Sequence, residues 1–423
     1  MRTYFFVLGK NPALSVSELR AVLDSFSSSF TLICLSHEVA VFRFVAPIDV
    51  PKVMKQLGGT VKMGEILDSS LLSESEDFFF RIISADNLLD RYFPKLRKIH
   101  FGLSLYNASS ELSIFSQLKA QQKSFLIHIK KSLQEKGASA GFLRVKDRFL
   151  SSVSVAKNSL LTKGAEIVLI LTPESILVGK TLAVFEFESF TLRDFYRPKK
   201  DKRSGIMPPK LARILLNISG VGANGVVLDP YCGSGTVIQE AVILGHRNII
   251  ASDISGKAIS DTRSNLEWIF EHYKSLDQSL YRIKIFQTDV NFLSRQIPPD
   301  SVDAIVTEPY LGPPFHKLPD QRIINSVLSE LNKLYLASFG EFHNVLKPEG
   351  TVVVIFPVFS TQGKSYFLEI LDGVRLRGFT FVPLLKSSVA NYFPSNISKR
   401  GTIVYGSPKQ FVRREILVFK KSA

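Results

Sequence analysis

Cysteine is almost absent from this 423-residue chain: only Cys34 and Cys232 occur, far apart in the sequence. Two such distant residues provide neither a disulfide framework nor the ligand spacing of a structural metal site, so we expect no metal and a reducing, cytoplasmic compartment. Long apolar runs are absent as well. No run approaches the roughly 18 residues of a membrane-spanning helix, and the apolar residues 3–8 lack a signal-peptide cleavage site. We therefore expect no membrane partner.

The composition is that of a globular protein. Hydrophobic residues make up 45% of the chain, and 33 residues are phenylalanine, which excludes disordered and fibrous classes. At about 150 residues per domain, the length indicates two or three domains.

Positive charge exceeds negative charge by 15, and the excess is uneven. Residues 1–210 hold 30 Lys and Arg against 20 Asp and Glu, whereas residues 211–423 hold 23 against 18. A basic front half favours contact with the phosphates of a nucleic acid, although solubility alone also explains a net positive charge.

The first half of the chain has a mixed α+β pattern. Apolar patterns predict helices at 14–23, 50–57 and 113–136, and strands at 3–8, 31–35, 38–44, 78–83, 99–105, 167–171 and 175–184. Between residues 123 and 157 only Glu135 and Asp147 oppose eight cations. This stretch is either a solvated face or an electrostatic cradle for an RNA or DNA backbone. For the second interpretation we assign the RNA contacts to Lys130, Lys131, Arg144, Lys146, Arg148 and Lys157, with Arg193 and Arg197 further along the chain.

The polar residues 193–205 form a charged connector and the best domain boundary. Beyond residue 225 the pattern alternates regularly. Helices are predicted at 236–244, 256–272, 321–345 and 364–376, and strands at 226–229, 248–252, 283–288, 303–307, 351–357 and 379–383. Two final strands, 401–405 and 415–419, are expected to form an antiparallel edge hairpin. This is an α/β sheet with helices on both faces.

A glycine-bearing turn, Asp229-Pro230-Tyr231-Cys232-Gly233-Ser234-Gly235-Thr236, joins the first of these strands to the next helix. Glycines let a backbone approach a ligand, and the helix start offers unpaired N–H groups. The third glycine of a dinucleotide fingerprint is missing, and an acid precedes the turn. Both features favour S-adenosylmethionine over NAD, with Asp229 accepting a hydrogen bond from the α-ammonium of the cofactor.

Two further acids end the next two strands. Asp253 is placed to bind ribose hydroxyls and Asp289 to receive an adenine amino group, since ligands of such sheets bind outside the carboxyl ends of the strands. Asp289 alone also reads as a helix cap. We assign cofactor binding to Asp229, Pro230, Gly233, Gly235, Thr236, Asp253, Ile254, Asp289 and Val290.

The fourth strand ends in Glu308-Pro309-Tyr310, which we assign as the catalytic residues. An exocyclic amine of a base is a poor nucleophile, so its methylation needs a hydrogen-bond acceptor for the N–H groups and a rigid, flat pocket. Cytosine-C5 methylation would need a cysteine nucleophile in this loop, and none is present. A proline-rich loop without catalytic function is the alternative interpretation.

The chain resembles the THUMP-domain tRNA (guanine-N2) methyltransferases, which are class I enzymes that use S-adenosylmethionine. The resemblance rests on Tyr4-Phe5-Phe6-Val7-Leu8-Gly9-Lys10-Asn11-Pro12, Val155-Ala156-Lys157-Asn158, Arg193-Asp194 with Arg197-Pro198, Met207-Pro208-Pro209-Lys210-Leu211-Ala212 and the glycine turn. It implies a ferredoxin-like subdomain at 1–60, a THUMP-like RNA-binding domain at 61–190, a linker at 191–210 and a Rossmann-like methyltransferase domain at 211–423. That domain would contain a mostly parallel seven-stranded sheet with an antiparallel C-terminal hairpin. The implied substrate is a guanosine of the tRNA core, such as the one at position ten, flipped from its stack.

One motif departs from the family. Its amine-methylating signature is Asp/Asn-Pro-Pro-Tyr/Phe, whereas this chain has Glu308-Pro309-Tyr310-Leu311. The carboxylate is one methylene longer, and the aromatic ring is shifted by one position. A non-catalytic RNA scaffold therefore remains an alternative, and DNA amino-methylation is another because it needs the same kind of pocket. The sequence leaves open the oligomeric state and any small activating protein partner.

Overall fold

The computed structural model describes residues 1–26, 29–72, 91–93, 98–145, 147–200, 206–315, 317, 319–361 and 363–422. These residues form two compact units, Met1–Phe187 and Glu188–Ala423. The predicted strand at 78–83 and the predicted RNA contact Lys146 lie outside the described residues. No described helix is long and apolar enough to cross a membrane.

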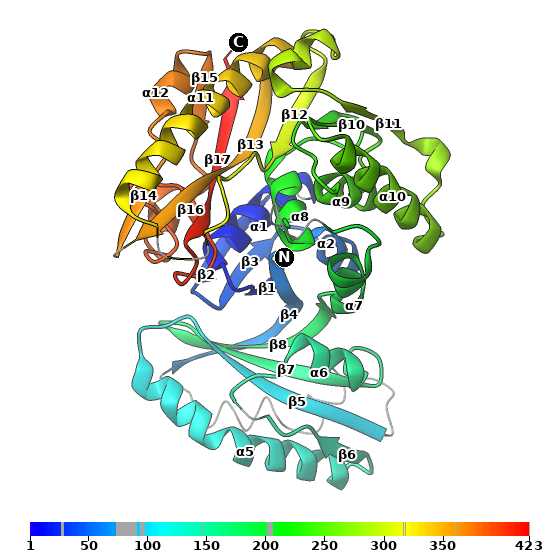
Figure 1. Cartoon of the computed structure of the whole chain (residues 1–423). Coiled ribbons are helices and arrows are strands. Elements are labelled where there is room, and N and C mark those ends of the chain that lie inside the picture. The colour runs from blue at the N-terminus through cyan, green and yellow to red at the C-terminus, as the bar shows by residue number, and fades with distance from the viewer. Residues whose placement is uncertain are drawn as a thin grey trace. The chain divides into compact units, whose positions relative to one another are not determined.

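The first unit is built on one eight-stranded sheet in the order β2-β3-β1-β4-β8-β7-β5-β6 (Figure 1). Its elements are β1 (Arg2–Leu8), α1 (Pro12–Phe26), β2 (Phe30–Leu35), β3 (Val39–Phe44), α2 (Val50–Gln56), β4 (Thr60–Leu71), β5 (Lys98–Asn107), α5 (Leu112–Glu135), β6 (Ser139–Phe142), α6 (Ser152–Lys157), β7 (Gly164–Leu171) and β8 (Ser175–Val184). A short helix, α7 (Phe187–Thr191), follows where the two units meet in sequence. The predicted elements of this half are confirmed wherever the structure describes them.

The first six elements follow the β-α-β-β-α-β order of a ferredoxin-like fold, with antiparallel neighbours β4-β1-β3-β2. Strand β4 also pairs with β8, so the same sheet continues into the following segment. The division at residue 60 therefore falls at the start of a shared strand, and it stays a prediction.

A buried ion pair fixes the segment before α6 to the sheet of the first unit. The ammonium of Lys62 contacts the carboxylate of Glu166, and it also donates to the carbonyl of Leu150. Ser104 and Thr181 donate hydroxyl hydrogen bonds of 2.5 and 2.6 Å to the same carboxylate. Burial lowers the pKa of Lys62, although Glu166 acts in the opposite direction. Satisfying every partner is what makes such a buried charge tolerable.

The second unit contains a nine-stranded sheet whose main path is β11-β10-β9-β12-β13-β17-β15 (Figure 1). Its strands are β9 (Val226–Asp229), β10 (Asn248–Asp253), β11 (Arg282–Gln287), β12 (Val302–Thr307), β13 (Leu346–Thr361), β14 (Lys364–Phe367), β15 (Phe379–Val382), β16 (Ile403–Tyr405) and β17 (Val412–Lys421). Its helices are η2 (Leu192–Tyr196), α8 (Pro209–Ser219), α9 (Thr236–Leu244), α10 (Gly256–His272), η3 (Gln278–Leu280), η4 (Val290–Arg295), α11 (Gln321–Val345), α12 (Leu371–Arg375) and α13 (Ser387–Ala390).

Strands β9 to β13 pair in parallel, whereas β17 is antiparallel to both β13 and β15. The expected mostly parallel seven-stranded path is therefore confirmed. The expected edge hairpin is wrong in one respect: β16 does pair antiparallel with β17, but β17 lies inside the sheet, between β13 and β15. Its side chains from Glu415 to Phe419 are buried, which suits a central strand.

The predicted helix at 364–376 is also wrong. Residues Lys364–Phe367 form β14, which pairs antiparallel with the end of β13, and only Leu371–Arg375 is helical. Strand β13 itself runs to Thr361, four residues beyond its predicted end. Tyr366 and Phe367 suit a strand because aromatic residues pack well on a pleated surface.

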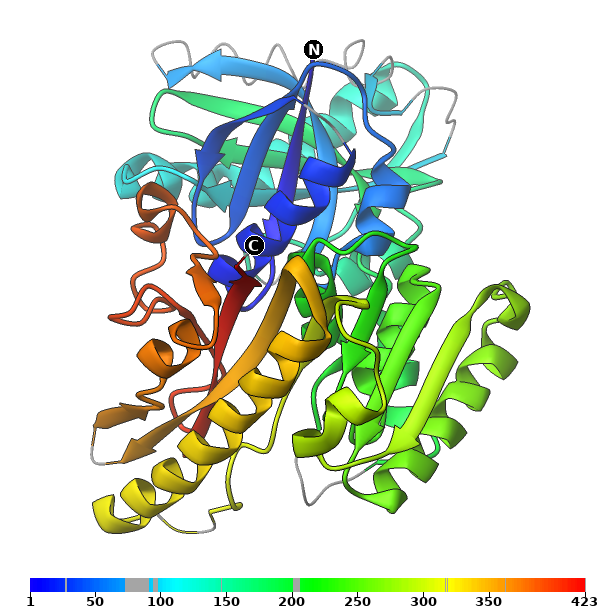
Figure 2. The same ribbon diagram turned by 90° about the horizontal axis from the view of Figure 1, so that it is seen from above.

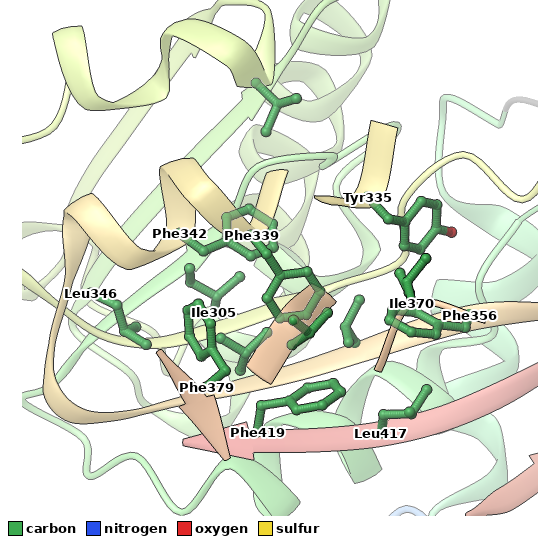
Figure 3. Close-up of a cluster of buried hydrophobic side chains, with 14 of the residues drawn as sticks. Ile305, Tyr335, Phe339, Phe342, Leu346, Phe356, Ile370, Phe379, Leu417 and Phe419 are labelled. Atoms are coloured by element: carbon green, nitrogen blue, oxygen red, sulfur yellow. The ribbon is translucent and has the colours of Figure 1, made fainter. Parts of the chain in front are cut away.

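Helix α11 covers one face of this sheet and runs alongside β13 (Figure 2). Tyr335, Phe339 and Phe342 recur at the spacing of one helix face and point toward Phe356 of β13 and Phe419 of β17 (Figure 3). The ring centroids of Tyr335 and Phe356 are 5.1 Å apart, and those of Phe339 and Phe419 are 5.3 Å apart. The intervening β13 residues Val353 and Ile355 are also buried, so both faces of the sheet are covered, as predicted.

Candidate active site

The glycine turn connects β9 to α9 at the carboxyl end of the sheet. Gly233 and Gly235 adopt positive φ angles of 53° and 81°, which L side chains rarely take. A Cβ atom at Gly235 would also lie 2.9 Å from the side chain of Thr262 on α10. Conformation and space therefore both require glycine at position 235, which lets the turn pack against α10.

A cavity of about 510 Å³ lies beside this turn, within the range of small-molecule sites. It brings together the ends of four strands, as the sequence predicted. Eleven of the twelve predicted cofactor and catalytic residues line it: Asp229, Pro230, Gly233, Thr236, Asp253, Ile254, Asp289, Val290, Glu308, Pro309 and Tyr310. The twelfth, Gly235, belongs to the turn but does not line the cavity.

Asp229 is 2% exposed and ends β9. Its carboxylate accepts hydrogen bonds from the backbone N–H of Tyr231 at 3.1 Å and from the hydroxyl of Thr307 at 2.7 Å. Burial raises the pKa of Asp229 to about 7, and the negative charges of Asp253 and Glu308 act in the same direction. This carboxyl group changes its charge near neutral pH.

Asp253 is held by two backbone groups. Its carboxylate accepts from the N–H of Gly233 at 3.0 Å and from the N–H of Ser255 at 2.9 Å. These contacts fix the carboxylate beside the turn and leave it further lone pairs for a ligand, because a carboxylate accepts about four hydrogen bonds.

Asp289 caps a helix and also lines the cavity, while its contact with an adenine amino group stays a prediction. Its carboxylate accepts from the N–H of Asn291 at 2.9 Å and caps η4, and the residue also lines the cavity. The capping bond orients the side chain at the cavity wall.

Glu308 follows β12 and forms an ion pair with Arg414 of β17. The Nε of Arg414 lies 2.5 Å from one carboxylate oxygen, and its Nη2 lies 3.2 Å from the other. Tyr310 lines the same wall with its side chain 53% exposed, while its carbonyl accepts from the hydroxyl of Tyr335 at 3.2 Å. The backbone of the loop is thus anchored to α11 while the ring stays available to a ligand.

Sequence reasoning missed several residues of this site. Arg414 stands 106 positions after Glu308, and no local pattern marks it. The cavity lining also includes Ile206, Met207, Tyr231, Cys232, Ser234, Val237, Ser255, Lys257, Ala258, Asp261, Asn291, Leu311 and Leu334. The stretch beginning at Met207 carried part of the family resemblance. That resemblance was the one sequence signal that could have placed Met207 in the cavity wall.

Cys232 lies in the turn but is unsuited to nucleophilic chemistry. Its thiol is buried beside Thr262, and burial raises the pKa of the thiol well above its usual range. The described residues hold no group of His, Cys, Asp and Glu side chains arranged for a metal ion.

Two predicted RNA contacts are wrong. Arg193 is 1% exposed, and its guanidinium binds Glu240 of α9, Ser189 and Tyr273. Arg197 is 2% exposed and donates to Thr236 at 2.7 Å. A buried arginine bound to interior partners cannot reach an RNA phosphate, so both residues support α9 and the turn instead.

The remaining predicted contacts belong to the first unit. Lys131, Arg144 and Lys157 are exposed and Lys130 is half-buried. Arg148 is already paired within the first unit. Its guanidinium forms a two-point ion pair with Glu38, one contact being 2.8 Å, and lies over the ring of Phe149. Its charge is matched by a carboxylate, but the side chain is 23% exposed, so its contact with RNA stays a prediction.

The sequence of this chain is similar to those of known proteins. Residues 196–368 match the family model described as the RMKL-like methyltransferase domain. A tRNA (guanine(10)-N2)-dimethyltransferase of Methanothermobacter thermautotrophicus is 34% identical over 194 residues, which are 44% of this chain and 49% of that protein. The chain thus spans about half the length of this relative. A U6 snRNA (guanine-N(2))-methyltransferase of Bos taurus, THUMPD2, is 27% identical over 146 residues, 34% of this chain and 24% of that protein.

A solved structure extends the likeness of fold along the chain. TrmN from Thermus thermophilus aligns with a TM-score of 0.55 at 15% identity, covering 99% of both chains. The sheet order, the glycine turn and the matched family model agree with one another. Over residues 196–368, this chain is therefore similar to the RMKL-like methyltransferase domain.

Proposed function

We propose that this chain transfers a methyl group from S-adenosylmethionine to the exocyclic N2 of a guanosine in tRNA. The observation that carries the proposal is the placement of Glu308 in the same cavity as Asp229, Asp253 and Asp289. The three aspartates that would bind the cofactor and the glutamate that would accept a hydrogen bond from the substrate amine thereby line the same cavity.

The charge of the cavity supports this cofactor. Its described lining holds five carboxylates, Asp229, Asp253, Asp261, Asp289 and Glu308, against a single cation, Lys257, which is itself paired with Asp261. Such a surface repels the pyrophosphate of a dinucleotide and attracts the ammonium and sulfonium charges of S-adenosylmethionine. When bound, the cofactor supplies an electrophilic methyl group on sulfur.

Three aspartates each bind a different part of the cofactor. Asp229 accepts from the α-ammonium of the cofactor, Asp253 accepts from the ribose hydroxyls, and Asp289 accepts from the adenine amino group. Ile254 follows Asp253 and Val290 follows Asp289, and both side chains offer apolar surface to the adenine.

Glu308 acts on the substrate. Its carboxylate accepts a hydrogen bond from the guanine N2–H and holds the nitrogen lone pair toward the methyl group. S-adenosylmethionine would supply the methyl group for the new C–N bond, and the electron pair of its broken C–S bond would stay on sulfur. The amine then loses one proton to Glu308 or to water. The exposed ring of Tyr310 stacks on the flipped base.

RNA recognition is proposed for the first unit through a THUMP-like segment at 61–190. Support comes from the exposed cations Lys131, Arg144 and Lys157 and from the activity named for the methanogen relative. A small activating protein partner and a cytoplasmic location belong to the same proposal.

Transfer of a labelled methyl group tests this function. We expect an unmodified tRNA transcript to accept label, and duplex DNA and a U6 snRNA transcript to accept far less. Preferential labelling of DNA would favour an amino-methyltransferase acting on adenine N6 or cytosine N4. Failure to bind S-adenosylmethionine would leave an RNA-binding scaffold, which is the non-enzymatic alternative.

A further inference from the structure

The second unit contains another cavity, separate from the one around Asp229. It measures about 710 Å³, and its lining shares no residue with the first cavity. Three segments build it: residues 363–369 around β14, residues 395–400, and Val404 and Arg413 of the last two strands. The function proposed above does not use these residues.

Positive charge dominates this second cavity. Its lining contains Lys364, Lys399, Arg400 and Arg413, whereas Glu369 is its single acid. The side chain of Glu369 is 81% exposed and lies 3.6 Å from Arg400. Within the described residues, Lys364, Lys399 and Arg413 have no carboxylate at ion-pair distance. The cavity thus carries an excess of three charges without counter-ions, which is the electrostatic character of an anion site.

Both arginines donate hydrogen bonds to neutral groups, and Arg400 also lies 3.6 Å from Glu369 and 3.8 Å from the buried Glu415. Nη2 of Arg413 donates to the hydroxyls of Ser365 at 3.0 Å and Ser360 at 3.3 Å, and its Nε is buried without an acceptor. Nη1 of Arg400 donates to the carbonyl of Leu368 at 2.8 Å, and its guanidinium lies 4.5 Å from the ring centre of Phe367. These contacts orient both guanidinium groups, and within the described residues the charge of Arg413 has no carboxylate at ion-pair distance. Fixed guanidinium groups suit phosphate recognition.

The second cavity and the active site each take one arginine from the same end of β17. Arg413 and Arg414 are consecutive in β17, so their side chains leave opposite faces of the sheet. Arg414 pairs with Glu308 at the first cavity, while Arg413 lines the second. Their partners in β13 are Pro357 and Val358, near the carboxyl end of that strand. A polyanion that passes around this end of the sheet could therefore contact Glu308 and the second cavity together.

We propose that this cationic cavity binds a backbone phosphate of the RNA substrate near the nucleotide held at Glu308. The inference rests on the proposed function in taking RNA as the polyanion, and it adds a phosphate site within the methyltransferase unit. The lysines supply exposed charges, and the arginines supply oriented donors.

The test is the salt dependence of RNA binding without cofactor. Lys364→Ala with Lys399→Ala removes two exposed charges from the cavity without touching the core. We expect the Kd for an unmodified tRNA transcript to rise about 5- to 10-fold. The slope of log K against log salt should become shallower by about 1, since each phosphate contact contributes roughly 0.7 to 0.9. Adding Arg413→Gln should deepen both effects.

A matched control is Lys274→Ala with Lys333→Ala, which removes the same charge from exposed positions that line neither cavity. Cofactor affinity reports on folding in every variant and should not change. If the cavity variant and the control bind RNA with equal affinity and slope, the proposal is wrong. If RNA binding is unaffected while wild-type protein binds inorganic phosphate tightly, the cavity serves free phosphate and the RNA assignment is overturned.

This result is separable from the proposed function. A chain that shows the expected loss of RNA affinity but methylates no guanosine would refute the function and retain the phosphate site. If the protein methylates tRNA but the cavity variant shows an unchanged salt slope, the proposed function stands and the phosphate site is refuted.

Discussion

The carboxylate of Glu308 and the guanidinium of Arg414 face each other with two contacts, of 2.5 and 3.2 Å, although the residues stand 106 positions apart. Both side chains are largely buried, with exposures of 14% and 17%. In the function proposed above, Glu308 takes the place of a shorter acid in the related signature, and the arginine fixes the position of the longer side chain. We therefore propose Arg414 as a positioning residue.

Replacing Arg414 with methionine should lower kcat about 10- to 100-fold and leave the KM for the cofactor within twofold. The reason is that the carboxylate of Glu308 loses its orientation while the acids that hold the cofactor are unchanged. Steady-state kinetics measure the split, and Arg414→Lys should recover part of kcat because one charged contact returns. A rise in the cofactor KM with constant kcat would refute the positioning role.

Glu308 and Arg414 should also stabilise the folded state together, so that the effects of replacing them are not additive. In a double-mutant cycle of Glu308→Gln and Arg414→Met, we expect an interaction energy of about 1–3 kcal/mol in urea unfolding, since removal of either partner leaves a partly buried charge unpaired. Additive effects would show that the contact contributes nothing to the folded state.

Cofactor binding should depend on pH through Asp229, whose pKa is raised to about 7. Only the ionised carboxylate attracts the α-ammonium of the cofactor, so affinity should rise close to tenfold from pH 5.5 to 6.5 and level off above 7. Calorimetric titration below pH 7.5 measures this, because an α-ammonium stays charged there. Asp229→Asn should bind more weakly and show a flat profile.

The folding stability of the free protein should fall as pH rises, whereas cofactor affinity rises. The pKa of Asp229 in the folded state lies above its unfolded value of about 3.9, so the folded state binds the proton more tightly. The resulting stabilisation is complete below pH 4 and disappears as pH rises to about 7. Asp229→Asn should lack this loss, and urea unfolding at pH 4.5 and 7.5 measures the difference. An identical pH dependence in both proteins would contradict the assignment.

The buried pair of Lys62 and Glu166 should matter for the first unit. Glu166→Gln leaves the ammonium without a counter-charge in the interior, which typically costs about 3–5 kcal/mol. Arg20→Ala breaks an exposed pair with Asp24 and should cost below about 1 kcal/mol. Urea unfolding followed by far-UV circular dichroism compares them. Equal, small losses would mean that water reaches Lys62.

Local patterns predicted the parts of the fold that local physics determines. The alternation from β9 to β12, the glycine turn and the acids at the strand ends are short-range signals, and the structure confirms them. The central position of β17 depends on pairing with distant strands, which its own residues do not specify.

Charged residues were the least predictable from sequence. Arg148 and Arg193 looked like exposed cations because Glu38 and Glu240, which neutralise them, lie 110 and 47 positions away. Arg414 was missed for the same reason. Whether a charge is available to a ligand depends on long-range contacts, and spacing along the chain does not reveal these.

The central claim is methylation of guanine N2 by way of Glu308. Mass spectrometry of nucleosides from a tRNA transcript incubated with protein and S-adenosylmethionine tests it most directly. Wild-type protein should yield N2-methylguanosine or its dimethyl form. Glu308→Gln should yield at least 100-fold less while binding cofactor and tRNA nearly as well as the wild type. Methylation of another base, or full activity of Glu308→Gln, would contradict the account.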